Sequence, residues 1–347
     1  MSRPARALLS LLSLAGAIGL LAALPYLVGV DWTEIGRELG RLSLWELAAL
    51  TLLWLAGLWA YTFVFTASLP GLAHWQALLM NAVGSAVSNL LPFGGAAGLA
   101  VTFAMARGWG HRNASITVSA LVTGVWNVLA RLLLPAVGIV ALLVAGELPD
   151  RRTAAMAVLA AAVILGILAI LVLALGSPRT ARAVDVRLRA LARRLPGRAG
   201  RWLLKGDGAL LSVRDKTVDV LRTGWRGLTY GMLAYLLLQA ALLYACLVAV
   251  GAHVQVAEAV AVFAINRMLT TAVVTPSGAG ISETGTAALL VSFGVPAGPA
   301  AAATILYSFY TFAVEIPAGG IGWLTWLFVR RTPSGTPLET YRVLARK

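Results

Sequence analysis

Ser88-Asn-Leu-Leu-Pro-Phe-Gly-Gly-Ala-Ala-Gly98 and Ala272-Val-Val-Thr-Pro-Ser-Gly-Ala-Gly-Ile-Ser282 share one design, 184 residues apart. Each stretch places a proline and two or three glycines inside an apolar run that otherwise suits a membrane-spanning helix. A gapless shift of 184 puts Pro92 on Pro276 and Gly94 on Gly278. Paired broken helices in the two halves of a membrane protein mark transport sites. The two stretches therefore predict a central site in a membrane-embedded fold.

The composition is that of a membrane protein. The 347 residues are 59% hydrophobic and 12% charged, which excludes an ordinary soluble globule. A run of about 20 apolar residues is long enough to cross a bilayer as a helix. Six such runs are expected to cross, at 7–30, 45–68, 115–146, 153–176, 225–250 and 300–329.

The distribution of basic residues predicts the side of the membrane on which each loop lies. Residues 177–226 hold thirteen Arg or Lys against four Asp, whereas residues 31–44 hold three acidic and two basic residues. Basic loops stay in the cytoplasm, so both termini are expected on the cytoplasmic side of the plasma membrane.

Six crossings agree with this orientation only if the interrupted stretches, 76–106 and 257–293, are re-entrant helical hairpins. The first must enter from the cytoplasm and the second from outside. The alternative gives each stretch two full crossings, ten in all. Its half-stretches of roughly 15 residues are short for a hydrocarbon core of about 30 Å.

The expected fold is an all-α polytopic membrane protein with about six transmembrane helices and two re-entrant hairpins in an inverted repeat. The expected divisions are a first membrane repeat at 1–176, with the second repeat starting from 153, a basic amphipathic loop at 177–224, the rest of the second repeat at 225–329, and a cytoplasmic tail at 330–347.

The second stretch resembles a family hallmark. From Arg267 the chain runs through apolar residues to Pro-x-Gly-x-Gly-x-x-Glu, which ends at Glu283. This pattern is similar to that of the lysylphosphatidylglycerol synthase transmembrane-region family, and Asn89-x-x-Pro followed by glycines resembles the first hallmark of that family. The resemblance covers roughly 10–330 and implies a flippase-like protein that moves a lipid, or a lipid-linked group, between leaflets.

One departure from the family pattern bears on the substrate. The family commonly has an acidic residue shortly after the first Pro/Gly element, where this chain has Ala97-Gly-Leu99. The resemblance therefore implies a class of substrate and leaves its identity open.

Four ionisable residues lie well inside apolar segments, namely Arg131, Arg267, Glu283 and Glu315. A charge at a helix centre costs about 2.5–3.5 kcal/mol on insertion scales, so these residues should face a cavity or one another. Arg131 and Glu315 are expected within ion-pair reach, where they would either fix helix packing or act on substrate. Arg267 would either meet a lipid phosphate bidentately or pair with Glu283.

The broken helices add backbone groups to the expected site. Helix N-termini just after Pro92 and Pro276 would direct their positive ends towards a phosphate or carboxylate. Alternatively, the glycines serve close helix packing. Besides the four charged residues, the predicted substrate-binding set comprises Asn89, Pro92, Gly94, Gly95, Pro276, Ser277, Gly278 and Gly280.

These features predict a flippase or transporter that moves a phospholipid or a polyprenyl-phosphate-linked lipid through a midplane cavity. The expected partners are membrane lipids with an anionic headgroup or a polyprenyl phosphate. One alternative is a secondary transporter of a small anionic solute, and another is a membrane-embedded lipid-modifying enzyme.

Other features of the sequence predict no further partner. The histidines are scattered, so neither a metal, a cofactor nor catalysis is expected. The basic loop has the spacing of a helix on the inner membrane surface, and without a recognisable motif it predicts no nucleic-acid partner. The sequence leaves the oligomeric state open.

Overall fold

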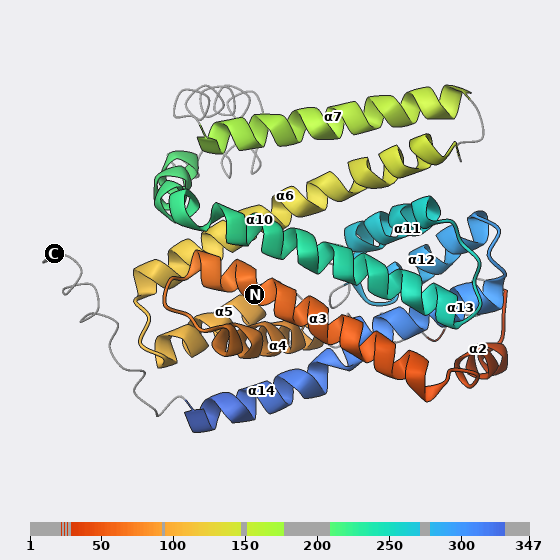
Figure 1. Cartoon of the computed structure of the whole chain (residues 1–347), viewed down its shortest axis with the longest axis horizontal. Coiled ribbons are helices and arrows are strands. Elements are labelled where there is room, and N and C mark those ends of the chain that lie inside the picture. Colours follow the sequence, from red (N-terminus) through yellow and green to blue (C-terminus); the bar gives the residue numbers. More distant parts are fainter. Residues whose placement is uncertain are drawn as a thin grey trace, which may run out of the picture.

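The computed structural model describes residues 22, 24, 26, 29–91, 94–146, 151–176, 209–270 and 278–329. For part of α7 and for 209–223, only the backbone is described. These residues form helices and connecting turns (Figure 1). The helices are α2 (Trp32–Leu39), α3 (Leu44–Ser68), α4 (His74–Leu90), α5 (Gly94–Gly108), α6 (Asn113–Ala145), α7 (Arg151–Gly176), α10 (Ala209–Ala249), α11 (Val256–Leu269), α12 (Ile281–Ser292), α13 (Ala297–Ser308), the π-helix η2 (Phe309–Ala313) and α14 (Glu315–Val329).

Four described segments are long and apolar enough to cross a membrane, which supports a multi-pass membrane protein. They are Leu44–Ser68, Asn113–Ala145, Gly224–Ala249 and Ala297–Val329. The expected crossing at 153–176 coincides with α7, in which the described apolar window is Val158–Ile167. The expected crossing at 7–30 lies almost wholly outside the described residues, as do the tail at 330–347 and residues 177–208 of the basic loop expected at 177–224.

Each interrupted stretch forms two short helices that pack against each other. Helices α4 and α5 contain 17 and 15 residues, and α11 and α12 contain 14 and 12. At 1.5 Å per residue these helices are roughly 18–25 Å long. All four are shorter than a hydrocarbon core of about 30 Å. The interruptions at 91–93 and 270–280 contain the proline positions of the two motifs.

The two halves of the chain exchange contacts around a central helix pair. Helix α3 packs along α10 in the middle of the molecule (Figure 1). On one side α4 packs against α14, and on the other α11 packs against α6. Adding 184 to the bounds of α6, 113 and 145, gives 297 and 329, which are the bounds of the α13–η2–α14 segment.

Glycines let these interhelical contacts come close, as is usual in membranes. A Cβ added to Gly319 of α14 would lie 2.7 Å from the Ala82 carbonyl oxygen of α4. A Cβ added to Gly138 of α6 would lie 3.1 Å from Cα of Ala261 in α11. Small residues therefore hold the first hairpin against the last helix and the second hairpin against α6.

Two elements differ from the expected boundaries. Helix α10 begins at Ala209, 16 residues before the expected start at 225, because residues 209–223 contain neither proline nor glycine to end the helix. The expected single helix at 300–329 contains a π-helical turn, in which the Val314 amide donates to the Phe309 carbonyl at 2.9 Å. Pro317 follows this turn, and because proline has no N–H it cannot complete the regular hydrogen-bond pattern.

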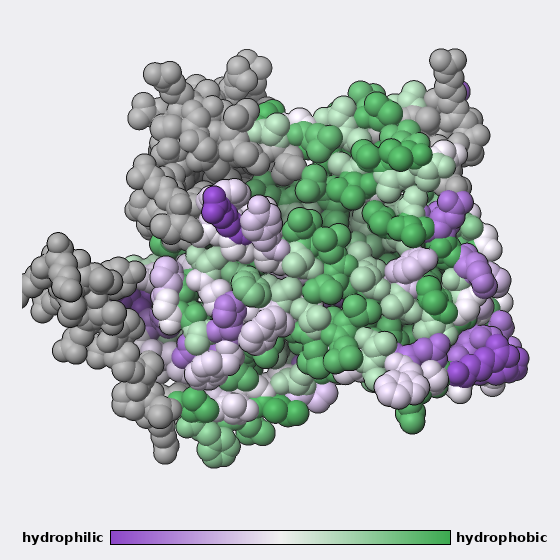
Figure 2. All heavy atoms as spheres, viewed as in Figure 1, coloured by the Kyte–Doolittle hydropathy of each residue, from purple (hydrophilic) through white to green (hydrophobic). Residues whose placement is uncertain are grey.

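The surface agrees with a membrane environment. Figure 2 shows hydrophobic residues over the middle of one face and a hydrophilic cluster over α2 at one end. Large apolar side chains such as Leu52, Trp59, Leu237 and Phe328 are exposed. In water such exposed apolar surface would be unfavourable, whereas lipid chains solvate it at no cost.

Candidate functional site

A polar cavity of about 540 Å³ lies between the two halves of the protein. It is bounded by α3, α4, α5, α6, α10, α11, α13, η2 and α14. Its polar and charged lining residues are Tyr61, Asn81, Ser85, Ser88, Asn89, Thr102, Thr123, Asn127, Arg131, Tyr235, Gln239, Asn266, Arg267, Thr270, Tyr307, Thr311 and Glu315.

Among the described residues, more of the first hairpin than of the second lines the cavity. Helix α4 lines it from Met80 to Asn89, and α5 lines it from Gly95 to Thr102. From the second hairpin, the C-terminal end of α11 contributes Asn266, Arg267 and Thr270, whereas α12, which is described throughout, contributes no lining residue. The two hairpins therefore occupy unlike positions around one site.

Two guanidinium groups and one carboxylate supply the charge of the described lining. They belong to Arg131 on α6, Arg267 on α11 and Glu315 on α14. Arg131 and Arg267 are close enough to interact electrostatically. An excess of positive charge in a membrane-embedded cavity favours an anionic group.

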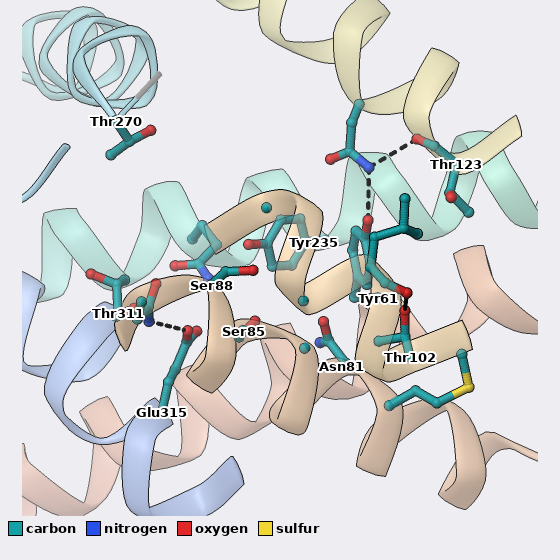
Figure 3. Close-up of a pocket in the computed structure, with 18 of the residues that line it drawn as sticks. Tyr61, Asn81, Ser85, Ser88, Thr102, Thr123, Tyr235, Thr270, Thr311 and Glu315 are labelled. Carbon is teal, nitrogen blue, oxygen red and sulfur yellow. Dashed lines mark hydrogen bonds between the residues drawn. The ribbon is translucent and has the colours of Figure 1, made fainter. Parts of the chain in front are cut away.

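A chain of aromatic and amide contacts positions Arg267. Its guanidinium carbon lies over the Tyr235 ring, 6.0 Å from the ring centroid. The Tyr235 ring meets the Tyr61 ring edge-on at 4.9 Å, and the Tyr61 hydroxyl accepts a 2.8 Å hydrogen bond from Nδ2 of Asn127. Figure 3 shows Tyr61 and Tyr235 side by side in the cavity. Helices α3, α6, α10 and α11 thus all hold the cation in place.

Asn89 joins the end of α4 to Glu315. Its Nδ2 donates to Oε2 of Glu315 at 3.0 Å and to the Thr311 carbonyl at 3.3 Å. Figure 3 shows Glu315 with a dashed hydrogen bond, close to Thr311. Thr311 lies in the π-helical turn, and such turns are frequent at functional sites. The first hairpin and the last helix therefore meet at a carboxylate that lines the cavity.

The expected ion pair between Arg131 and Glu315 is wrong. Both residues line the cavity, but among the described residues the one basic–acidic pair within 4.0 Å is Arg41–Glu38. Asn89 holds the Glu315 carboxylate, and Arg131 has Arg267 as a charged neighbour. The rotation of α6 and α14 about their axes is set by packing, so mirrored sequence positions alone do not bring the two side chains into contact.

Glu283 points into the protein and lies outside the cavity lining. Its carboxylate accepts from the Gly280 amide, from the Ser282 hydroxyl at 2.9 Å and from the Ser308 hydroxyl at 2.8 Å. The first contact caps the N-terminus of α12, where a negative charge is favourable, and the third ties α12 to α13. The alternative in which Arg267 pairs with Glu283 is not supported, because no such pair within 4.0 Å occurs among the described residues.

The predicted glycines divide between lining and packing. Gly95 lines the cavity, and a Cβ added there would meet nothing within 4 Å. Gly94 lies against the Ser88 backbone, and its carbonyl accepts a 3.2 Å bond from Oγ of Ser88. Gly278 and Gly280 adopt φ values of 75° and 85°, which favour glycine in the turn before α12. The predicted Pro92, Pro276 and Ser277 lie outside the described residues.

Sequence reasoning missed several lining residues. Tyr61 and Tyr235 were not singled out, because the sequence does not reveal which of eight tyrosines faces a cavity. A usable signal was present in α4, where Asn81, Ser85 and Ser88 recur at spacings of four and three. Such spacing places polar side chains on one helical face.

The described residues contain no group of three or more His, Cys, Asp or Glu that could hold a metal ion. No curated protein and no solved structure matches the chain. A family model described as the lysylphosphatidylglycerol synthase transmembrane region matches residues 10–319. This match covers most of the 347 residues and includes both interrupted stretches and every described residue that lines the cavity. The chain belongs to the lysylphosphatidylglycerol synthase transmembrane-region family.

Proposed function

We propose that this protein is a lipid transporter that moves a lipid with an anionic headgroup between leaflets, without a covalent change to the lipid. The observation that carries the proposal is the pair Arg131 and Arg267 in one polar cavity, with Glu315 as the carboxylate among the described lining residues. A guanidinium binds phosphate bidentately, and exclusion of water strengthens that contact. The headgroup phosphate would lie between the two arginines.

We take the exposed lining residues between α5 and α6 to mark a side opening of the cavity, which would favour a lipid over a small solute. Gly95 and Leu99 of α5 and Gly124 of α6 line the cavity and are also exposed on the surface, Leu99 to 51%. We name these three residues the α5–α6 opening. Through it a headgroup could enter the cavity while the acyl chains stay in the bilayer.

The repeat supports a transport cycle. The matching bounds of α6 and the α13–η2–α14 segment, and the exchanged contacts α4–α14 and α6–α11, support an inverted repeat. In this proposal both hairpins are re-entrant and both termini are cytoplasmic. The basic residues Arg107 and Arg112 beside the first hairpin support a cytoplasmic position for its open end in this proposal. One repeat rocking against the other would then expose the site alternately.

The test is a leaflet assay in proteoliposomes with acyl-labelled lipids. Arg267→Ala should lower the initial rate for phosphatidylglycerol at least about 10-fold, because a hydrogen bond to a charged group contributes about 1.5–3 kcal/mol. Arg226→Ala is the matched control, since Arg226 stacks on Trp225 and lies outside the cavity lining. Equal rates for Arg267→Ala and wild type would contradict the proposal. Wild-type protein that moves no lipid but takes up a small phosphate ester would favour a solute transporter instead.

A further inference from the structure

Three buried polar atoms on the second-repeat wall of the cavity have no hydrogen-bond partner among the described residues. They are Oε1 of Gln239 on α10, Oδ1 of Asn266 on α11 and the hydroxyl of Tyr307 on α13. Each side chain lines the cavity and is 2% exposed. A buried polar group without a partner costs about 1–3 kcal/mol, so three on one wall require an explanation.

Packing between helices does not account for these atoms. Asn266 already donates Nδ2 to Oγ1 of Thr286 at 3.0 Å, which ties α11 to α12, while its Oδ1 has no partner among the described residues. Tyr307 contrasts with Tyr310, one turn on, whose hydroxyl donates to the Leu47 carbonyl at 3.1 Å. The Tyr310 hydroxyl is hydrogen-bonded, whereas the hydroxyl of the cavity-lining residue Tyr307 is buried and has no partner among the described residues.

The chemistry of the three atoms defines what they can bind. The two amide oxygens only accept hydrogen bonds, and the phenol hydroxyl can accept or donate. Together they form a surface for hydrogen-bond donors, beside Arg267, which donates only. One site thus offers hydrogen-bond donors to a phosphate and hydrogen-bond acceptors to the group attached to that phosphate.

We infer that Gln239, Asn266 and Tyr307 form a subsite for the part of the headgroup beyond the phosphate, and that this part carries O–H or N–H donors. This inference rests on the proposed transport function and narrows its substrate class. Headgroups of this class end in a glycerol, a sugar or a primary ammonium group. A choline headgroup has no such donor and would leave all three atoms unpaired. Rejection of an analogue that lacks a required polar group is the strongest form of discrimination in a binding site.

The transport test compares phosphatidylglycerol, phosphatidylethanolamine, a polyprenyl-phosphate-linked sugar and phosphatidylcholine, all labelled away from the headgroup. Wild-type protein should move at least one donor-bearing lipid about 10-fold faster than phosphatidylcholine. The lipid preferred among the first three identifies the donor as a glycerol hydroxyl, an ammonium group or a sugar hydroxyl. Phosphatidylcholine moving as fast as all the others would overturn the subsite and leave the proposed transport function standing.

The variants Tyr307→Phe and Gln239→Leu test the residues themselves. Each should slow the preferred lipid about 2- to 10-fold, the range for one hydrogen bond, and leave phosphatidylcholine unchanged. Neither should lower the melting temperature, because each removes a polar group that has no partner in the protein. Tyr310→Phe is the control, in which headgroup preference stays as in wild type and the melting temperature falls. A loss of stability in Tyr307→Phe with unchanged preference would make the hydroxyl structural and overturn the inference.

A binding measurement separates failure of the subsite from failure of transport. In detergent, glycerophosphoglycerol or phosphoethanolamine should raise the melting temperature of wild-type protein more than phosphocholine or inorganic phosphate does. The difference should shrink in the Tyr307→Phe/Gln239→Leu double variant. This outcome would support the subsite even if no lipid moved, whereas equal stabilisation by all four probes would contradict it.

Discussion

The two hairpins end in the same turn and differ in what lies beside them. After α5 the His111 amide donates to the Ala106 carbonyl at 3.2 Å, and after α12 the Val295 amide donates to the Leu290 carbonyl at 3.1 Å. Both turns contain a glycine with positive φ. Such turns end helices by satisfying their last carbonyl groups. The two hairpins therefore end in the same backbone conformation.

The largest difference between the two halves lies at the contact between each hairpin and the helix that follows it. Leu99 and Gly124 belong to the α5–α6 opening, and adding 184 to their numbers gives Glu283 and Ser308. This second pair is joined by the 2.8 Å hydrogen bond between α12 and α13, and Glu283 is 1% exposed. Equivalent positions are thus open in one half and bonded in the other. We expect the open half to admit substrate and the bonded half to block the opposite side.

Closing the open half should have the largest effect. In the variant Leu99→Cys/Gly124→Cys, a short bismaleimide should link α5 to α6 and abolish lipid movement, because gating motions cannot reopen a tethered gap. Gly124 tolerates the change, since an added Cβ meets nothing within 4 Å. Native Cys246 is fully buried, so it should not react. The single-cysteine variants under the same treatment are the controls, and full transport in the cross-linked protein would show that lipid enters elsewhere.

Weakening the hydrogen bonds of Glu283 in the second half should lower the free energy of unfolding. Glu283→Gln should lower the free energy of unfolding by about 2–3 kcal/mol, because it weakens hydrogen bonds to a buried charged group. Ser308→Ala removes the α12–α13 bond alone and should cost about 1–3 kcal/mol. Ser292→Ala on the same helix α12 is the matched control, expected within about 0.5 kcal/mol of wild type because Ser292 is exposed. Thermal unfolding in detergent measures the stability of all three variants. If Ser308→Ala is as stable as wild type, the Glu283–Ser308 hydrogen bond does not distinguish the two halves.

The sequence indicated the two helix breaks and the charged residues of the described cavity wall. Proline and glycine break a helix by local geometry, so the breaks near Pro92 and Pro276 could be located without a structure. Arg131, Arg267 and Glu315 could be assigned to a cavity because a charge within apolar segments needs a polar neighbour. All three line it.

Side-chain direction could not be predicted, because it depends on how helices rotate against one another. From sequence, Glu283 looks the same whether it faces a substrate or caps α12. Arg131 and Glu315 occupy equivalent positions without pairing, and Tyr61 gave no local signal. Leu99 and Glu283, which are related by the shift of 184, differ in chemistry. The shift therefore predicted helix boundaries more reliably than it predicted which side chains line the site.

The smallest expected effect is a pH dependence of stability that only the turn after α5 should show. Burial lowers the pKa of His111 below its usual value, whereas its mirror, Val295, cannot titrate. A histidine with a lowered pKa binds protons more readily in the unfolded chain. Its contribution should therefore be favourable above about pH 6.5 and decline as the pH falls towards the folded pKa. Arg107 and Arg112 flank the same turn, and positive neighbours act in the same direction.

The variant His111→Val makes the first turn resemble the second. Melting temperatures of wild type and variant at pH 7.5 and pH 5.5 form a four-way comparison, in which all other titrating groups cancel. On acidification the melting temperature of the wild type should fall further than that of the variant. The difference should be smaller than the effect of Glu283→Gln on the melting temperature. Equal losses would show that the His111 ring is hydrated in the folded protein. The two turns would then contribute alike to stability as well as share a backbone conformation. The remaining contrast between the hairpins would be the α5–α6 opening in one half and the Glu283–Ser308 hydrogen bond in the other.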